Sequence, residues 1–527
     1  MNRRKFLAGA GALLAAPRIA HAQAKKTLKF VPQADVTILD PIIVPAFVTR
    51  NHAFLVFDTL YGVDSNFVAR PQMVEGHQIE DEGKRWLLTL RDGLKFHNNE
   101  PVLAKDVVAS LNRWGKRDSW GADLFAATES LKVISDKVVE FRLKRPFPTL
   151  PDVLGKPGVH TPCIMPEHLA AADPFVAVTE MIGSGPFRFV PGERVSGALT
   201  VYEKFAGYQP RKDGSSDFLA GPKVANVDRV EWRIIPDAAT AAGALQAGEI
   251  DWWEQPIADM LPMLQANDQL VTTVLDKSGV MGLLRLNHLH PPFNNPAIRR
   301  ALWPAIDQVA YMTAVTGPDP RMWRDKIGYF TPGPMASDAG MEALTTPRSR
   351  EKSRQALKEA GYKGEPVTLL APADVPTHYA MALVTQDLFK GIGLNVDLVS
   401  ADWGTEVRRF NSKAPPGKGG WNAVCNVTTG AVTANPADHR MIRGTGEAGG
   451  IWGWPSDDKL EAHRSAFLQA ETMDGRREAC RKMQIEAFEN VPYIPLGLYF
   501  QPTSFRKAVA GISNGFPTFY NLKLGQG

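Results

Sequence analysis

One short pattern in the sequence has the form of a catalytic motif. Gly511-Ile-Ser-Asn-Gly515 matches the G-x-S-x-G elbow of serine hydrolases, in which an acid and a histidine that follow in the chain activate the serine. Residues 514–527 contain no Asp, Glu or His, and Pro517 removes the helix that should follow the elbow. These residues are therefore predicted to form a loop.

The sequence also contains no motif that indicates a metal site or a nucleotide site. His288 and His290 are two residues apart on a predicted strand, so a zinc site would need ligands from remote parts of the chain. The sequence contains no H-E-x-x-H, no G-x-x-x-x-G-K-[ST] and no acidic calcium loop. We expect no catalytic residues, no metal site and no cofactor. An exported enzyme with a cryptic active site stays open as the alternative, and turnover of a ligand would distinguish it from mere binding.

The elements that would position a site form two different patterns along the chain. Short extended runs bounded by turn residues predict strands in the first half, and Gly248 closes one of its helices. From about residue 280 strands alternate with helices, which predicts an α/β sheet covered on both faces. The predicted strands are 27–31, 86–90, 138–143, 229–235, 282–287, 367–371, 395–401 and 493–500, the last returning to the first lobe; the predicted helices are 101–114, 237–247, 296–312, 351–360, 378–390 and two within 457–489.

The first 22 residues have the composition of a cleavable export signal. A basic start, an apolar run over residues 6–16 and a small-residue end at Ala22 follow one another, and the run is well below the roughly 20 residues that span a bilayer. Arg3 and Arg4 resemble a twin-arginine signal, and Arg18 disfavours the ordinary unfolded-chain route. A general secretory signal is the alternative. Both routes predict a periplasmic protein cleaved near Ala22.

Charge and cysteine content restrict the partners of the mature chain. Loss of the signal removes four basic side chains and no acidic one, so the formal charge of +4 falls to zero. A chain without net charge or a basic run has no electrostatic footprint for nucleic acid or anionic lipid. Cys163, Cys425 and Cys480 are far apart and allow at most one disulfide. About 505 residues exceed the ~250 at which one core stops growing, so at least two lobes are expected.

Several sequence blocks occur in the order known from one protein family, the peptide-type family 5 extracellular solute-binding proteins of ABC importers, and the chain resembles that family over nearly its whole mature length. The most distinctive block is 86–114, with an R-D-G turn and a K-F-H strand end before a helix. The blocks are 35–41 (DVTILDP), 86–114, 183–187 (GSGPF), 227–235 followed by Asp237, 246–251 (QAGEID), 292–307 and 491–495 (VPYIP).

The resemblance implies a bilobal periplasmic-binding-protein clamp of class II, the large type with an extra subdomain, with the ligand cleft between the lobes. Its first lobe would comprise residues 23–46, 180–272 and 490–527, with an inserted subdomain at 47–179, and its second lobe residues 273–489. Two chain crossings would form the hinge, and ligand would favour the closed state. The implied partners are a small-molecule or peptide ligand and the ABC permease membrane subunits. A monomer without enzymatic activity is expected.

The resemblance also implies which residues line the cleft. In the family, the loop after the first strand lines it, here with Asp35 and Thr37, and so does a tryptophan after a second-lobe strand, here Trp403. The strand near Trp421 ends, in peptide binders, in a W-x-x-D-like stretch whose aspartate meets the ligand's α-ammonium. Ala431 stands at the aspartate position, so this charge anchor is missing. The neutral side chains that would replace it are Asn426, Thr428 and Thr429.

Aromatic side chains could add stacking surfaces to this cleft. For each tryptophan, packing in a core is the alternative interpretation. The candidates are Trp120, Phe125, Trp452 and Trp454.

A peptide or peptide-like ligand is expected. Because the carboxylate anchor is missing, an amine-blocked, neutral or anionic ligand is predicted to bind at least as well as a free dipeptide. The resemblance leaves opines, nickel chelates, haem and sugars open as ligand classes.

Overall fold

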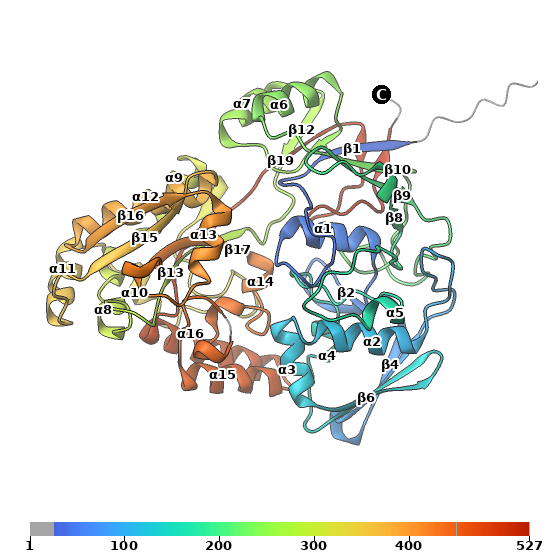
Figure 1. Ribbon diagram of the computed structural model, residues 1–527, viewed down its shortest axis with the longest axis horizontal. Helices are drawn as coiled ribbons and strands as arrows, with labels where there is room; N and C mark the ends of the chain where they lie inside the picture. Colours follow the sequence, from blue (N-terminus) through green and yellow to red (C-terminus); the bar gives the residue numbers. More distant parts are fainter. Residues whose placement is uncertain (1–25, 450, 526–527) are drawn as a thin grey trace, which may run out of the picture.

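The computed structural model describes residues 26–449 and 451–525 of the chain. Two large β-sheets lie in opposite halves of the molecule, and a smaller sheet with its helices lies beside the first of them (Figure 1). This arrangement confirms the predicted α/β fold with two lobes. The predicted signal, residues 1–22, lies outside the described part of the chain.

The first lobe is built on a seven-stranded sheet in the order β12-β19-β11-β1-β10-β9-β8. Phe30 of β1 (Thr27–Val31) lies opposite Trp232 and Trp252 on the neighbouring parallel strands, and its ring centroid is 5.7 and 5.0 Å from theirs. These large rings fill the core of the lobe. The remaining strands are β8 (Phe187–Phe189), β9 (Leu199–Lys204), β10 (Arg229–Arg233), β11 (Trp252–Trp253), β12 (Leu270–Thr273) and β19 (Thr503–Arg506), with a small pair formed by β20 (Val509–Ala510) and β21 (Lys523–Leu524).

The helix α6 (Ala238–Ala247) of this lobe begins and ends close to the residues that the sequence predicts. The Asp237 carboxylate accepts a hydrogen bond of 2.8 Å from the Thr240 N–H at the start of this helix. Gly248 follows with φ of 74°, a conformation that glycine adopts without strain. The other helices are α1 (Phe47–Val56) and α7 (Leu261–Ala266).

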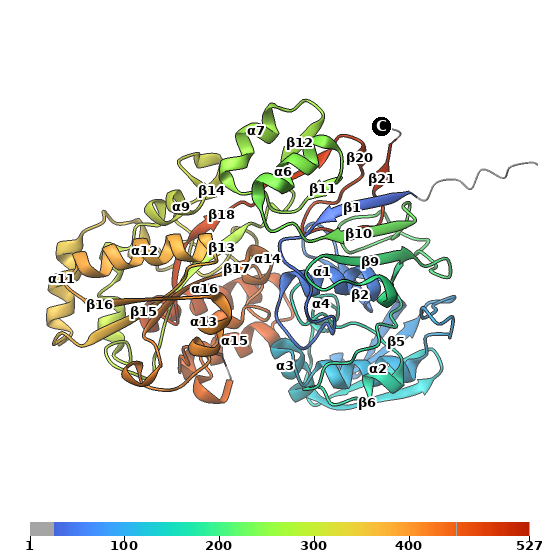
Figure 2. The ribbon, with the colours of Figure 1, turned by 45° about the horizontal axis from the view of Figure 1, so that its top comes forward.

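The second lobe contains a six-stranded sheet in the order β14-β18-β13-β17-β15-β16. The strands β15, β16 and β17 are parallel, and α12 and α13 lie on its two faces (Figure 2). The strands are β13 (Val280–Leu286), β14 (Trp323–Arg324), β15 (Pro366–Pro372), β16 (Asn395–Ala401), β17 (Ala423–Thr429) and β18 (Ile494–Tyr499); the helices are α8 (Pro296–Arg300), α9 (Gln308–Thr316), α10 (Glu342–Thr345), α11 (Arg350–Glu359), α12 (Pro376–Gly391), α13 (Trp403–Phe410), α14 (Gly430–Thr433), α15 (Asp458–Gln469) and α16 (Met473–Asn490).

A third unit lies between α1 and β8 in the sequence and contains a four-stranded sheet in the order β4-β5-β7-β6. The resemblance implies a subdomain over residues 47–179, a range that also includes α1; we call the unit between α1 and β8 the inserted subdomain. Its elements are β2 (Tyr61–Val63), β3 (Ala69–Pro71), β4 (Val74–Glu80), β5 (Arg85–Leu90), β6 (Thr128–Ser135), β7 (Val138–Leu143), α2 (Ala104–Trp114), α3 (Ser119–Ala127), α4 (Leu150–Leu154) and α5 (Glu167–Ala170).

The single helix predicted over residues 296–312 is wrong. The chain forms α8, a 3-10 turn and then α9, which begins after Asp307. Pro304 lies in the 3-10 turn, where its missing N–H cannot support a continuous α-helix. Asp307 then starts the new helix, because its carboxylate accepts hydrogen bonds from the N–H groups of Val309 and Ala310 at 3.0 and 3.4 Å.

The prediction that strand 493–500 returns to the first lobe is also wrong. Its residues form β18, which pairs with β13 and β14 inside the six-stranded sheet of the second lobe. The next strand, β19, makes the return, pairing with β11 and β12 in the first sheet. The sequence could not assign these strands to a sheet, because the pairing partner of a short strand lies far away in the chain.

The chain crosses between the two large sheets twice. Residues 274–279 lead from the end of β12 to the start of β13, and residues 500–502 lead from the end of β18 to the start of β19. The two lobes therefore share a hinge of two adjacent connections. At the opposite end, α3 of the inserted subdomain lies against α15 of the second lobe (Figure 1), where Asp123 pairs with Arg464 at 2.7 Å.

Candidate functional site

In both lobes, the carboxyl ends of the parallel strands point toward the hinge between the two sheets. The parallel strands β15, β16 and β17 of the second lobe end at one edge, and β18 ends there too because it and β17 are both antiparallel to β13. In the first lobe, β1, β10 and β11 end at the edge from which the crossing segments leave. In open α/β sheets, ligands bind outside the carboxyl ends of the strands. The candidate site is the cleft between these edges.

The second-lobe wall of the cleft combines neutral polar side chains with two exposed carboxylates, Asp374 and Asp402, which follow the ends of β15 and β16. The Trp403 ring at the start of α13 lies 5.0 Å from the His378 ring, and Asn426 of β17 hydrogen-bonds the same histidine. Burial lowers the pKa of His378 to about 4, although the Asn426 contact opposes this. Burial raises the pKa of Tyr499 at the end of β18, where Thr377 is its hydrogen-bond partner. The five side chains around His378 are neutral at pH 7.

Two faces of β17 meet the cleft region in different ways. Asn426 and Thr428 are two residues apart and share one face of the strand, and both are partly exposed. The side chain of Thr429 lies on the opposite face of the strand and is 5% exposed. Its Oγ1 atom is buried without a hydrogen-bond partner in the described part of the chain.

A cavity of about 70 Å³ lies at the hinge, with walls from both lobes. Gln33, Arg50 and Glu254 come from the first lobe, Thr429 and Val280 come from the second, and the crossing segments complete the lining. A water molecule occupies about 30 Å³ of liquid, so the space matches one small polar group rather than a whole ligand. The cavity lining consists of Gln33, Phe47, Arg50, Trp252, Glu254, Gln255, Leu275, Asp276, Gly279, Val280, Thr429, Gln501, Thr503, Gly515, Phe516 and Pro517.

Glu254 is the most strongly perturbed carboxyl group of this cavity. One oxygen accepts a hydrogen bond of 2.7 Å from the Gln33 N–H, and the other accepts one of 3.0 Å from Asn51 Nδ2. Burial raises its pKa to about 7, although these two donors and the nearby Arg50 lower it. Near neutral pH the group is therefore partly protonated, which places a titrating side chain at the hinge.

The predicted residues of the first strand's loop lie at the facing edge but differ in their surroundings. Asp35 accepts a hydrogen bond of 2.8 Å from the Gly197 N–H through Oδ2, and its Oδ1 is buried without a partner among the described residues. Thr37 is exposed. Neither of them lines the hinge cavity. Their contact with a ligand stays a prediction.

Two of the proposed stacking residues lie away from the hinge, on α3. Trp120 is 2% exposed and belongs to the main buried apolar cluster, against which Phe125 packs in a partly buried position. Both residues share this helix with Asp123, which contacts the second lobe. They therefore lie where the inserted subdomain meets the second lobe.

Trp454 is part of the core of the second lobe. It is 4% exposed and lies 6.3 Å from the Trp421 ring in a cluster that also contains Trp452 and Phe410. Trp403 packs at the margin of the same cluster, 5.8 Å from the Phe410 ring, and keeps an exposed surface. The ligand contact of Trp403 stays a prediction, whereas Trp454 has the surroundings of a core residue.

Several residues of the site escaped the sequence analysis. Arg50, Glu254, His378 and Tyr499 come from four separate parts of the chain, and Arg50 and His378 have polar neighbours in the sequence. A charged residue inside an apolar run, as in Trp252-Trp253-Glu254, was the available signal. Such a charge requires either a partner or a function when the run is buried.

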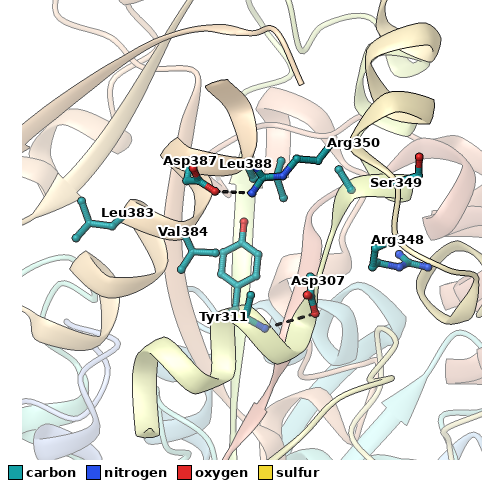
Figure 3. A pocket seen from close by; sticks show the side chains of 11 residues that line it. Asp307, Tyr311, Arg348, Ser349, Arg350, Leu383, Val384, Asp387 and Leu388 are labelled. Carbon is teal, nitrogen blue, oxygen red and sulfur yellow. Dashed lines mark hydrogen bonds and ion pairs between the residues drawn. The ribbon is translucent and has the colours of Figure 1, made fainter. Parts of the chain in front are cut away.

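A larger cavity of about 480 Å³ lies on the outer side of the second lobe, between α9, α11 and α12 (Figure 3). Its polar side chains already have partners: Asp307 caps α9, Arg350 pairs with Asp387, and the Tyr311 hydroxyl bonds Thr385 at 3.0 Å. All of its lining belongs to one lobe. Closure of the two lobes cannot enclose it, so we do not assign it to the cleft.

The described residues offer little for catalysis or metal binding. Gly511–Gly515 form a loop after β20, as predicted, without the strand-turn-helix context of an esterase elbow. In residues 26–449 and 451–525, no three His, Cys, Asp or Glu side chains gather as metal ligands. The cysteines of the described chain are buried and free. No helix within these ranges is long and apolar enough to span a membrane.

Comparison with known proteins identifies relatives over the whole chain. Residues 69–432 match the family model described as bacterial extracellular solute-binding proteins, family 5 Middle. A probable peptide ABC transporter periplasmic-binding protein of Sinorhizobium fredii is 34% identical over 532 aligned positions, which cover 99% of each chain.

Two solved structures show the same fold at lower sequence identity. A dipeptide-binding protein of Pseudoalteromonas sp. SM9913, in complex with Met-Leu, has a TM-score of 0.79 with 18% identity and covers 95% of this chain and 100% of its own. The periplasmic binding protein AgaA of A. tumefaciens R10, in complex with agropinic acid, has a TM-score of 0.77 with 21% identity and covers 95% and 99%.

Proposed function

The chain belongs to family 5 of the bacterial extracellular solute-binding proteins, and we propose that it is the substrate-binding component of an ABC importer. It captures a peptide or peptide-like small solute and delivers it to the permease membrane subunits. The observation that carries this proposal is the pair of facing sheet edges joined by two crossings. A ligand there touches both lobes only when they close, so binding shifts the population toward the closed state.

The ligand class follows from the relatives and from the charge of the cleft. The relative from Sinorhizobium fredii is named for peptides, and the two structural neighbours hold a dipeptide and agropinic acid. The side chains around His378 are neutral, and Ala431 stands where a carboxylate would hold a free amine, while the carboxylates of this wall, Asp374 and Asp402, are engaged by backbone N–H groups. We therefore place peptides and peptide-like amides first and opines second. Nickel chelates, haem and sugars are the remaining classes.

The protein works outside the cytoplasm and without catalysis in this proposal. The basic and apolar start of the chain supports export and cleavage near Ala22, and the family is extracellular. The ligand-contacting residues are proposed to be Asp35, Thr37, Trp403, Asn426, Thr428 and Thr429. The mature protein acts as a monomer, because one chain supplies both walls of the cleft.

Ligand release and lobe closure test the function together. Small molecules released from the purified mature protein are identified by mass spectrometry, and the same compound is then added back to stripped protein. We expect a smaller radius of gyration by X-ray scattering and a melting temperature that rises with ligand concentration. Recovery of a chemically altered ligand would contradict the proposal and support the enzyme alternative.

A further inference from the structure

Arg50 is a buried cation without an ion pair in the described part of the chain. It is 5% exposed, and its side chain donates hydrogen bonds to Asn51 Oδ1 alone, from Nε at 3.3 Å and Nη2 at 3.0 Å. A guanidinium carries five N–H groups, so three of them have no protein acceptor. Burial lowers the pKa of Arg50 to about 10, although Asp276 and Glu254 oppose this. These N–H groups are not fully enclosed, so water or a ligand in the cavity can reach them.

Two aromatic rings lie close to this guanidinium. The carbon at its centre lies 3.7 Å from the centroid of the Phe516 ring and 5.2 Å from that of Phe47. Both rings line the hinge cavity together with Arg50. The N–H groups of a guanidinium lie in one plane. This planar fork matches the two oxygens of a carboxylate.

Two acids line the same cavity, and neither pairs with Arg50. Asp276 is half-exposed, and its Oδ1 accepts hydrogen bonds from the N–H and the hydroxyl of Ser278 at 2.9 and 2.5 Å. Glu254 is occupied by Gln33 and Asn51, and its raised pKa reduces its charge near pH 7. The first acid is open to water, and the second is partly protonated near pH 7. Both raise the pKa of Arg50 from a distance, so Arg50 has acids nearby but no direct ion pair among the described residues.

The second lobe contributes a donor from the opposite wall. Thr429 Oγ1 is buried, lacks a hydrogen-bond partner among the described residues and lines the cavity that Arg50 lines. A carboxylate that accepts hydrogen bonds from Arg50 and Thr429 would therefore bridge the two lobes. The volume of about 70 Å³ has room for such an end group and leaves the rest of the ligand in the cleft.

We infer that Arg50 and Thr429 bind a carboxylate of the transported solute, either its free carboxyl terminus or an acidic side chain, at the hinge between the lobes. The inference rests on the proposed function, because it assigns one end of the captured solute. It also gives the ligand a charge anchor in the first lobe, in a chain where Ala431 replaces the second-lobe anchor for an amine.

Calorimetry with Met-Leu, Met-Leu amide and Met-Glu amide tests this anchor. The wild-type protein should bind Met-Leu at least 10-fold more tightly than its amide, and Arg50→Met should reduce that ratio to about one. Thr429→Val should weaken Met-Leu binding 3- to 10-fold and leave the amide unchanged. Arg481→Met, which removes an exposed arginine of α16 paired with Glu478, is the charge-matched control and should keep the wild-type preference. Tight binding of Met-Glu amide would identify an acidic side chain as the source of the carboxylate.

The remaining outcomes separate the anchor from the function. Equal affinity of the wild-type protein for acid and amide, with lobe closure intact, would overturn the carboxylate anchor and leave the transport function standing. If none of the three probes binds, melting in acetate and in acetamide at constant ionic strength decides the anchor. Stabilisation by acetate that Arg50→Met abolishes supports it, and equal effects of the two solutes overturn it. Arg50→Lys serves if the Met variant does not fold, and it should reduce the acid preference.

Discussion

Lys156 Nζ lies 2.6 Å from Asp438 Oδ1, and this buried ion pair joins the inserted subdomain to the second lobe. Lys156 also contacts Asp118 at 2.5 Å within its own subdomain. Burial alone would lower the pKa of the lysine, but the two carboxylates outweigh it and raise the pKa. Asp123 forms a second bridge across the same boundary, to Arg443 at 3.1 Å and to Arg464 at 2.7 Å. These pairs exist only while the two parts are in contact, so they bias the lobes toward closure.

Asp438→Asn should therefore favour the open state. The substitution removes the pair that crosses the boundary and leaves Lys156 paired with Asp118, so the fold of the subdomain is retained. A hydrogen bond between charged groups is worth about 1.5 to 3 kcal/mol, and we expect ligand affinity to fall by roughly that amount. Scattering should show a larger radius of gyration before ligand is added. Asp319→Asn, in an exposed pair inside the second lobe, should change neither quantity. An unchanged radius of gyration and affinity in Asp438→Asn would contradict the closing role.

Trp403 and Trp454 should respond to alanine in opposite ways. Trp403→Ala should weaken ligand binding by about 1 to 3 kcal/mol if its exposed ring packs on the ligand. Trp454→Ala removes a 4% exposed ring from an aromatic cluster and should destabilise the fold by about 3 to 5 kcal/mol. Calorimetric titration and urea unfolding of both variants check this. The assignment is wrong if Trp403→Ala loses stability but no affinity.

Glu254 should make stability fall as pH rises toward neutrality. Its pKa is raised from 4.5 to about 7, so the native state holds a proton that the unfolded chain has lost. Its contribution is fully present below pH 4.5 and is lost as pH rises through 7. Linkage gives about 3 kcal/mol over this window. Relative to Glu254→Gln, the wild-type protein should lose roughly this much between pH 4.5 and 7.5 in urea unfolding. The exposed control Glu471→Gln should follow the wild-type curve, and parallel curves for Glu254→Gln would exclude the titration.

Export should depend on the arginine pair at the start of the chain. Replacing Arg3 and Arg4 by lysine should trap precursor in the cytoplasm if the route is twin-arginine, because that route reads the pair itself. Fractionation with N-terminal sequencing of the mature protein should locate the cut after Ala22. Undiminished export of the lysine variant would leave the general secretory route.

The bounds of helices and strands could be predicted from the sequence where interactions between nearby residues set them. The strands predicted at 27–31, 138–143 and 395–401 have the bounds of β1, β7 and β16, and α6 ends at the predicted Gly248. Caps, turn glycines and alternating burial act within a few residues and are visible in the sequence. The prediction over 296–312 was wrong because the stop at Pro304 and the restart at Asp307 interrupt a pattern that is otherwise helical.

The sequence alone determined the family, the α/β class and the lack of a catalytic motif, since these depend on residue type and order. Only the tertiary structure decided that β18 belongs to the second lobe, that Trp454 lies in a core and that Arg50, Glu254 and Thr429 share one cavity. These three residues are about 200 positions apart along the chain, and their significance comes from their burial beside one another. Desolvation depends on what surrounds a group in space, and the order of residues does not contain that information.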